Sequence, residues 1–491
     1  MATGVLTLTL YKLLDNSVLS TTKLNVSVVN PNVIMTMETN PEVLTILYNK
    51  CSHRMSSSEY LLRTEAELFT DSDIYIDATN SIFTGKSITH FEEFEYFTGL
   101  TKIPAFCFSG CTLLTKLVLP ENIESVGLNA FQNTILTSLH IPRKVKTIDQ
   151  GAFSFAKQLT DITVDNYNSM FTSDGHSLYK GIGFDVLYVV APGLTEYTMP
   201  VETTSVYGEG DVTWRSASLL KKIILNDKVQ GVTGKWFMYG FSNLTEITGP
   251  ERSDIKYHNG CIYNSDYSKL IYWPSGKAYS EEGLKHNDSG ECLVNEFGER
   301  SFSQNKLLGS FTIPSTVTKL GEWVFYSTSI PSIKVHSNVT SIGNYCFSWN
   351  TKLKTAEINT IRVTGTNLFT SCSNLETVSL ASVDLIPDSM FSTCSNLVTI
   401  DIPETVTSIG AFAFNNCSKL ISITIPSGVK NIGQSCFMGC TKLGDINSLA
   451  SIAPSLGTEA FGNDPSNYTG NKVDVKELHV PRTATGYESN D

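Results

Sequence analysis

Charged residues and long apolar runs are both scarce in this chain of 491 residues. Charged residues make up 17 % of the sequence and hydrophobic residues 41 %, which is too apolar and too weakly charged for a disordered chain. No stretch reaches the roughly 18 consecutive apolar residues of a transmembrane helix, so we expect no membrane insertion. The first apolar stretch has no basic segment before it, which predicts that no secretory signal peptide is present.

Basic residues are too few for nucleic-acid binding. The 36 Lys and Arg residues are outnumbered by 48 Asp and Glu residues, which gives a net charge of −12. A protein that binds the phosphate backbone needs a dense basic face. We therefore expect no nucleic-acid partner.

Signatures of catalysis and of metal binding are missing as well. The sequence contains no H-E-x-x-H, no G-x-S-x-G and no P-loop. Its 11 cysteines include no C-x-x-C pair, and most of them lie at fixed offsets from phenylalanines. That placement favours small buried hydrophobes at a repeat position over zinc ligands. We expect a non-enzymatic protein with no catalytic residue, no metal and no cofactor.

The main feature that is present is an internal repeat. An aromatic residue that follows an I/V/L-G-x-x-x pattern returns every 22 to 24 residues over long stretches of the chain. A fixed period of this length is typical of a solenoid, in which each unit contacts only its neighbours. The recurring residues are Phe108, Phe131, Phe153, Trp214, Phe237, Phe302, Phe325, Phe347, Phe369, Phe391, Phe414, Phe437 and Phe461.

Each unit is interpreted as one coil. The segment LVTIDIP (397–403) alternates apolar and polar residues, which predicts a short strand with one buried face. Pro403 ends this strand because it cannot donate a ladder hydrogen bond, and Gly410 is expected to allow a backbone angle that other residues resist. Phe414 then points inward on a turn or a short helical segment. The sequence predicts a repeat solenoid of short parallel β-strands.

These units resemble the BspA-type leucine-rich repeat family. The segment MFSTCSNLVTIDIPETVTSIGAFAFNNCSKL (390–420) follows that family's Phe-x-x-Cys-x-x-Leu-x-x-Ile-x-Ile-Pro-x-x-Val-x-x-Ile-Gly unit, and the likeness covers roughly residues 85–481. Residues 88–108 are similar to the way such arrays open in proteins of Bacteroidales bacteria and their phages. The resemblance implies a leucine-rich repeat solenoid and a role in attachment to host proteins or other cells.

Four regions are expected along the chain. Residues 1–80 have no repeat and predict a small β-rich N-terminal domain, with EVLTILYNK (42–50) as one of its strands. Residues 81–165 hold a capping segment and the first rungs. In 166–300 two hairpins, 166–190 and 255–277, interrupt the rungs, and residues 301–491 hold regular rungs and the C-terminal end.

Two groups of residues are candidate binding residues. Small polar side chains on the outward strand face suit hydrogen bonding to a glycan or a protein surface, and they equally suit simple solvation of a strand. Aromatic residues at the end of the second hairpin could stack on sugar rings or anchor an interface, or pack inward on the solenoid. The candidates are Thr377, Ser379, Thr399, Asp401, Ser422 and Thr424 on the strand face, and Tyr272 and Trp273 in the hairpin.

The sequence therefore predicts a recognition or adhesion protein. The leading hypothesis is a phage virion protein, a tail fibre or spike, in which residues 1–80 dock to other virion proteins and the array binds a cell-surface glycan or protein receptor. The alternative is a cell-surface, extracellular BspA-like adhesin of a bacterium or protist. A glycan depolymerase is the second alternative, although Asp401 and Asp445 lie roughly 10 Å apart by rung spacing, beyond the usual range of paired carboxylates. A homo-oligomer is left open, since no heptad or collagen-like stalk demands one.

Overall fold

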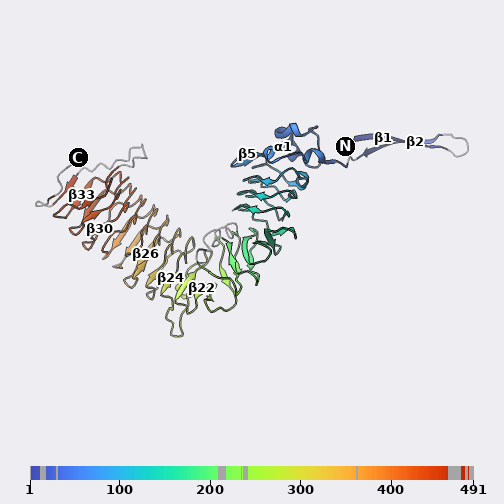
Figure 1. The fold of residues 1–491 in the computed structure, drawn as a ribbon. Coiled ribbons are helices and arrows are strands. Elements are labelled where there is room, and N and C mark those ends of the chain that lie inside the picture. The colour runs from blue at the N-terminus through green and yellow to red at the C-terminus, as the bar shows by residue number, and fades with distance from the viewer. Residues whose placement is uncertain are drawn as a thin grey trace. The chain divides into compact units, whose positions relative to one another are not determined.

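The computed structural model describes residues 2–11, 18–28, 31–149, 151–207, 217–233, 235, 241–360, 363–381, 383–462, 477–480 and 485. The chain divides into two compact units, residues 1–194 and 195–491. Both are β-rich (Figure 1). The repeat anchors Trp214 and Phe237 lie outside the described residues.

The first unit begins with short helices and strands and continues into repeat coils. Its elements are β1 (Ala2–Tyr11), β2 (Val18–Val28), β3 (Val33–Thr36), α1 (Pro41–Cys51), η1 (Ser52–Arg54), β4 (Tyr60–Leu62), α2 (Arg63–Ala66), α3 (Asp71–Ile74), β5 (Tyr75–Asp77), β6 (Asn80–Ser81), β7 (His90–Phe91), η2 (Glu92–Tyr96), β8 (Lys102–Ile103), β9 (Lys116–Leu117), β10 (Ser125–Val126), β11 (Ser138–Ile141), β12 (Thr147–Ile148), β13 (Asp161–Val164), β14 (Phe171–Ser173), β15 (Ser177–Lys180) and β16 (Val186–Val190).

The second unit is built of repeat coils and one hairpin insertion. Its elements are β17 (Glu196–Thr198), β18 (Ser205–Val206), β19 (Lys222–Ile224), β20 (Glu246–Thr248), β21 (Ile255–His258), β22 (Cys261–Asn264), β23 (Lys269–Tyr272), η5 (Glu281–Gly283), β24 (Glu296–Phe297), β25 (Lys319–Leu320), β26 (Ser332–Val335), β27 (Ser341–Ile342), β28 (Thr355–Ile358), β29 (Thr377–Leu380), β30 (Ser408–Ile409), β31 (Ser422–Ile425), β32 (Asn431–Ile432), β33 (Asp445–Ser448), β34 (Ser455–Leu456) and β35 (Glu477–His479).

Regular coils contribute to two parallel sheets. Four-residue strands such as β28 and β29 pair in register, and their residues alternate between exposed or half-buried and buried. Two-residue strands such as β25 and β27 pair in the same way in a second sheet. The predicted parallel β-solenoid is therefore confirmed. The alternation arises because successive side chains of a strand point to opposite faces.

The recurring phenylalanines stack on one another inside the solenoid. In the second unit the rings from Phe302 to Phe461 form one continuous column, with neighbouring centroids 5.1–5.7 Å apart and interplanar angles of 1–17°. In the first unit Phe83, Phe108, Phe131 and Phe153 form an equivalent column at 5.4–6.0 Å. Phe83 extends this column by one ring that the repeat pattern did not identify.

The phenylalanines sit on turns, and not on helical segments. Residues two positions before and two positions after the ring adopt a positive φ: around Phe391 these are Ser389 at 54° and Thr393 at 61°. Two left-handed residues in each turn are incompatible with a right-handed helix. The turn instead hydrogen-bonds to the next coil, since the Phe369 N–H donates to the Met390 carbonyl at 2.8 Å.

The glycine that recurs in each repeat has a different role from the one expected. Gly410 and Gly433 are absent from the positive-φ glycines, so their backbone angle does not require glycine. A Cβ on Gly433 would lie 2.3 Å from the Ala411 nitrogen, and one on Gly410 would lie 2.5 Å from the Asp388 nitrogen. Glycine is needed because the backbone of the preceding coil passes too close for any side chain.

Both expected hairpin insertions are present. In the first, β14, β15 and β16 pair antiparallel, and in the second β21, β22 and β23 do so. The SDG segment (173–175) connects β14 to β15, and NSD (264–266) connects β22 to β23.

The N-terminal region contains strands β1 to β6, but one of its segments differs from the prediction. The segment expected as a strand at 42–50 is helix α1, whose apolar residues Val43, Leu44 and Leu47 are buried. Its spacing of three and four residues fits a helix better than a strand. The Asn40 side chain donates to the His90 carbonyl at 2.8 Å. Residues 31–80 thus pack on the first coil as a cap.

Candidate recognition surface

The predicted strand-face residues lie on the exposed side of the four-residue strands. Thr377 and Ser379 are exposed on β29, opposite Thr355 and Glu357 of β28. On β31, Thr424 is exposed and Ser422 is half-buried. The structure therefore places these hydroxyl groups where a partner could reach them.

The sheet is interrupted where Thr399 and Asp401 lie. Residues 397–403, expected as a strand, form no strand in the structure, and the sheet order β26-β28-β29 is separate from β31-β33-β35. Alternation nevertheless persists, because Ile400 and Ile402 are buried while Thr399 and Asp401 are exposed.

Prolines explain the interruption. In a regular coil the residue after the strand closes the ladder: the Ala381 N–H donates to the Ile358 carbonyl at 2.9 Å. The corresponding residues of the next two coils are Pro403 and Pro426, which have no N–H to donate. Proline thus removes ladder hydrogen bonds on both sides of residues 397–403, and not merely at one strand end.

The electrostatics of this face are dominated by local pairing. Lys334 of β26 contacts Glu357 of β28 at 2.7 Å, and Asn359 donates to the same carboxylate oxygen at 2.7 Å. Both hydrogen bonds lower the pKa of Glu357 below its usual value. Within the described residues no group of three or more His, Cys, Asp or Glu side chains could hold a metal ion.

Tyr272 and Trp273 are not available for binding. Their side chains are each 1 % exposed, so the expectation that they stack on sugars or anchor an interface is wrong. The indole donates to the Lys277 carbonyl at 3.2 Å and packs against Tyr279 and Phe302, with ring centroids at 5.4 and 5.8 Å. These aromatic side chains lie in the core because removing their apolar surface from water stabilises the fold.

An aromatic column on the turn surface was missed. The side chains two positions before the anchor phenylalanine stack from coil to coil: the Arg300 guanidinium lies 4.8 Å from the Trp323 ring, which stacks on Tyr345 at 4.1 Å. Tyr326 meets Trp323 edge-on at 4.8 Å, and Trp349 is 53 % exposed. Aligning the repeat by its anchor would have revealed the run of Arg, Trp and Tyr at one position.

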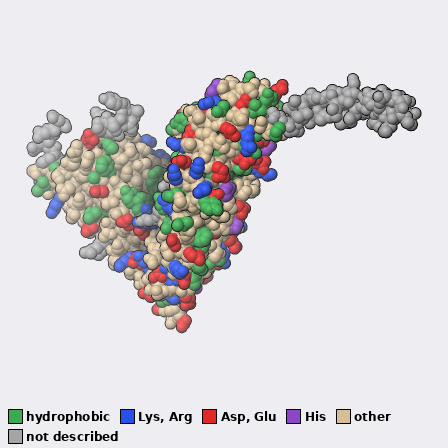
Figure 2. Space-filling model, turned by 45° about the vertical axis from the view of Figure 1, so that its right-hand side comes forward, with side chains coloured by type: hydrophobic (Ala, Val, Ile, Leu, Met, Phe, Trp, Pro, Cys, Tyr) green, Lys and Arg blue, Asp and Glu red, His purple; other side chains and the backbone are tan. Residues whose placement is uncertain are grey.

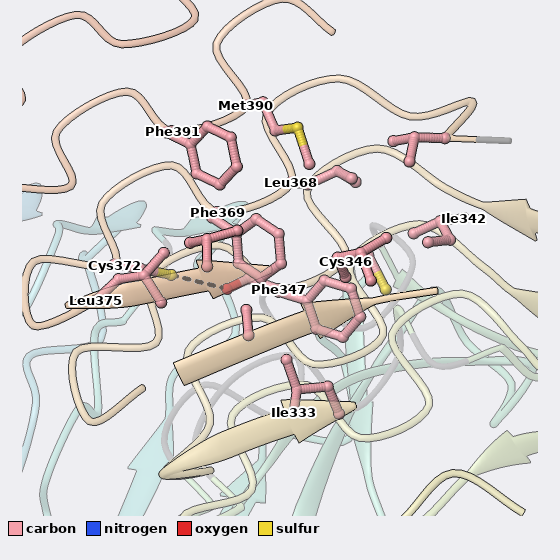
Figure 3. Packing of buried hydrophobic residues seen from close by; sticks show 14 of the residues in the cluster. Ile333, Ile342, Cys346, Phe347, Leu368, Phe369, Cys372, Leu375, Met390 and Phe391 are labelled. Atoms are coloured by element: carbon pink, nitrogen blue, oxygen red, sulfur yellow. Dashed lines mark hydrogen bonds between the residues drawn. The ribbon is translucent and has the colours of Figure 1, made fainter. Parts of the chain in front are cut away.

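The cysteines form a buried ladder. The thiol of Cys372 donates to the Phe347 carbonyl at 3.2 Å (Figure 3), and Cys394 donates in the same way to the Phe369 carbonyl. Burial raises the pKa of Cys372 to about 12. Such thiols are neutral and inert, in keeping with the expected structural role. Asn350 takes the same position in another coil, and its amide donates to the Phe325 carbonyl at 2.7 Å.

Acidic, basic and apolar side chains are interspersed on the face shown in Figure 2.

The Phe column, the two parallel sheets and the buried thiol ladder define a leucine-rich repeat solenoid. The described part of the chain contains no helix with the length and apolarity needed to cross a bilayer.

The family is shown by its repeat model. The model for the BspA type leucine rich repeat region matches six copies over residues 79–178, 277–383 and 364–469. These ranges cover more than half of the chain, so the chain belongs to the BspA-type leucine-rich repeat family.

Solved structures of leucine-rich repeat proteins from several bacteria are similar to this chain. A leucine-rich repeat protein from Eubacterium ventriosum is 23 % identical, with 68 % of this chain and 78 % of that chain covered and a TM-score of 0.39. One from Bacteroides ovatus is 20 % identical, with 78 % and 76 % covered and a TM-score of 0.32. A leucine rich cell surface protein from Faecalibacterium prausnitzii is 20 % identical, with 73 % and 62 % covered and a TM-score of 0.24. No curated protein matches this chain.

Proposed function

We propose that this chain is a non-enzymatic recognition protein whose repeat array binds a receptor on a bacterial surface. The observation that carries the proposal is that each coil has separate sets of buried and exposed positions. The core is fixed by the Phe column and the apolar strand positions, while exposed positions such as Thr377, Ser379 and Thr424 are free to vary without disturbing it. A rigid array with a variable outer face is suited to recognition.

The finer proposal is that the chain is carried on a phage virion as a tail fibre or spike. It is supported by the antiparallel pairing of β1 with β2 over ten residue pairs at the N-terminus. A two-stranded hairpin is marginally stable by itself in water and gains stability from a partner surface. We propose other virion proteins as that partner. A cell-surface adhesin is the second candidate, favoured by membership of the family.

Binding to cells tests the first proposal. The purified full chain is mixed with intact Bacteroidales cells, with and without capsule, and bound protein is measured after washing. The matched variant lacks residues 1–30 but keeps 31–80, because α1 and its neighbours pack on the first coil. Saturable binding by both forms is expected. If neither form binds, the array is not a receptor-binding element for these cells.

Measuring phage adsorption to cells distinguishes a virion protein from a cell-surface adhesin. A phage fibre added in excess should occupy the receptor and lower the adsorption of the phage that carries it, as measured by free plaque-forming units. A cell-surface adhesin would leave adsorption unchanged. Release of reducing ends from purified capsule would contradict the non-enzymatic proposal and indicate a depolymerase.

A further inference from the structure

The second sheet has a gap in the middle of the regular coils. It runs through β25 and β27, stops, and resumes at β30. In the intact part the Gly343 N–H donates to the Leu320 carbonyl at 2.8 Å. In the next coil side chains take over this role: the Thr364 hydroxyl donates to the Ile342 carbonyl at 2.9 Å, and Asn344 accepts from the Thr366 N–H at 2.9 Å.

Two departures from the repeat cause this gap. The connection from Ile358 to Thr364 is one residue shorter than the connection from Val335 to Ile342. A shift of one residue reverses which side chains face inward, so Val363 is 5 % exposed while Thr364 is exposed.

The coil that follows carries the second departure. Pro387 occupies the position of Gly365 and Gly410 in the neighbouring coils, and it has no N–H for the ladder. The Gly410 N–H, by contrast, donates to the Ile386 carbonyl at 2.8 Å. Among the described residues the backbone ladder is therefore interrupted on both sides of the coil of Thr364, towards the coil of Ile342 and towards the coil of Pro387.

An open groove of about 520 Å³ lies at this gap. Its volume is within the range of small-molecule binding sites, roughly 300–1,000 Å³. Segment 363–366 forms one wall and segment 384–388 the other, and Ser408 and Gly410 line the far end. A groove of about 420 Å³ lies at the equivalent repeat positions of the first unit, around Pro104 and Gly127, but its lining includes the basic residue Lys102.

The chemistry of the groove fits a neutral sugar. Asp384 and Asp388 supply exposed carboxylates, and the Thr364 and Thr366 hydroxyls lie on the opposite wall. Asp388 is held in place because it accepts from the Ala411 N–H at 2.7 Å. Sugar hydroxyls donate well to such acceptors. None of the described lining residues is basic, so an anionic ligand would meet two carboxylates without a compensating charge.

Apolar surface complements these acceptors. Leu385 is 37 % exposed in the groove and offers an apolar contact for the C–H face of a pyranose ring, whereas Pro387 is buried beside it. The opposite wall of the groove is hydrogen-bonded to the aromatic column. The N–H of Tyr345, which belongs to that column and follows Asn344, donates to the Thr366 carbonyl at 3.0 Å.

We propose that the groove between residues 363–366 and 384–388 binds a neutral oligosaccharide. Asp384 and Asp388 accept hydrogen bonds from sugar hydroxyls, and Leu385 contacts a ring face. This inference rests on the proposed recognition function and specifies the receptor chemistry.

A glycan microarray and calorimetry test the groove. The full chain is applied to neutral and acidic oligosaccharides of bacterial and mammalian origin, and the strongest neutral ligand is titrated by calorimetry. Leu385→Trp fills the groove, and Asp384→Asn removes a carboxylate while keeping its shape. Lys319→Trp places the same bulk at an exposed site of the same repeat column in the intact sheet. Thermal melting by circular dichroism checks that each variant is folded.

Leu385→Trp and Asp384→Asn are expected to weaken binding at least tenfold, and Lys319→Trp less than twofold. Equal binding by all variants, or no neutral ligand on the array, would overturn the groove proposal. Cell binding that persists in Leu385→Trp would leave the recognition function standing while the groove fails. Loss of cell binding after protease treatment but not after periodate oxidation would point to a protein receptor instead.

Discussion

Removing one ring from the phenylalanine column should open the solenoid locally. Phe369 is fully buried and stacks on Phe347 at 5.2 Å and on Phe391 at 5.7 Å (Figure 3). We expect Phe369→Ala to lower the free energy of unfolding of the second unit by about 3–5 kcal/mol, the usual cost of a cavity of this size. Phe369→Leu keeps most of the apolar volume and should cost about 1.5 kcal/mol or less.

The position along the column sets the size of the effect. Phe461 is half-buried and, within the described residues, stacks only on Phe437, at 5.1 Å. With one stacking neighbour among the described residues in place of two, we expect Phe461→Ala to cost roughly half as much as the central substitution.

Hydrogen exchange with mass spectrometry gives the most direct readout, because long repeat arrays do not unfold in a single two-state step. Coupling in a solenoid is mainly between nearest neighbours. Phe369→Ala should therefore speed exchange in peptides around Phe347 and Phe391 and leave coils further away almost unchanged. Uniform acceleration across the unit, or equal effects of the central and terminal substitutions, would refute this reasoning.

Three further predictions concern the thiol ladder and the close approach of neighbouring coils. Cys394→Ala removes one of two donors to the Phe369 carbonyl, which keeps the Cys372 N–H at 3.0 Å, and should cost about 0.5–1.5 kcal/mol in urea unfolding, whereas Cys394→Ser keeps both donors and should cost less. Because burial raises the pKa of Cys372 to about 12, its thiol stays neutral in the fold but ionises in the unfolded chain above pH 9. Stability should therefore fall as pH rises from 9 towards 12, by about 1.4 kcal/mol for this thiol at pH 10, and Cys372→Ser should make the measured decline shallower. Gly433→Ala should lower the melting temperature because its Cβ would lie 2.3 Å from backbone, whereas Gly428→Ala, with 3.3 Å to its nearest atom, should be tolerated; equal melting of the two variants would contradict the close-approach account.

The repeat was readable from sequence because each coil uses the same position for the same physical purpose. Phe391 and Ile400 recur at fixed spacing and are buried as expected. The role of the pattern glycine was not readable, since the distance from Gly433 to the preceding coil depends on how tightly two coils pack. Helix α1 was misassigned because a short apolar run can suit a strand or a helix, and tertiary packing decides.

The candidate site was only partly predictable. Exposure of Thr377 and Ser379 followed from strand alternation, which is a local property. The burial of Trp273 did not, because it depends on Tyr279 and Phe302, which lie further along the chain. The groove required knowing that Thr364 and residues 384–388 lie on facing walls, which a shortened connection determines in three dimensions.

The repeat and its interruptions have opposite physical consequences. At positions that follow the pattern, any change disturbs two neighbouring coils, so the residue type is dictated by packing. Where the pattern breaks, at Thr364 and Pro387, a ladder hydrogen bond is already missing, and the freed space is open to solvent. A partner that fills this space costs the fold nothing further. For a solenoid of this kind, the coils that depart from the repeat pattern are therefore the places where a specific binding site destabilises the fold least.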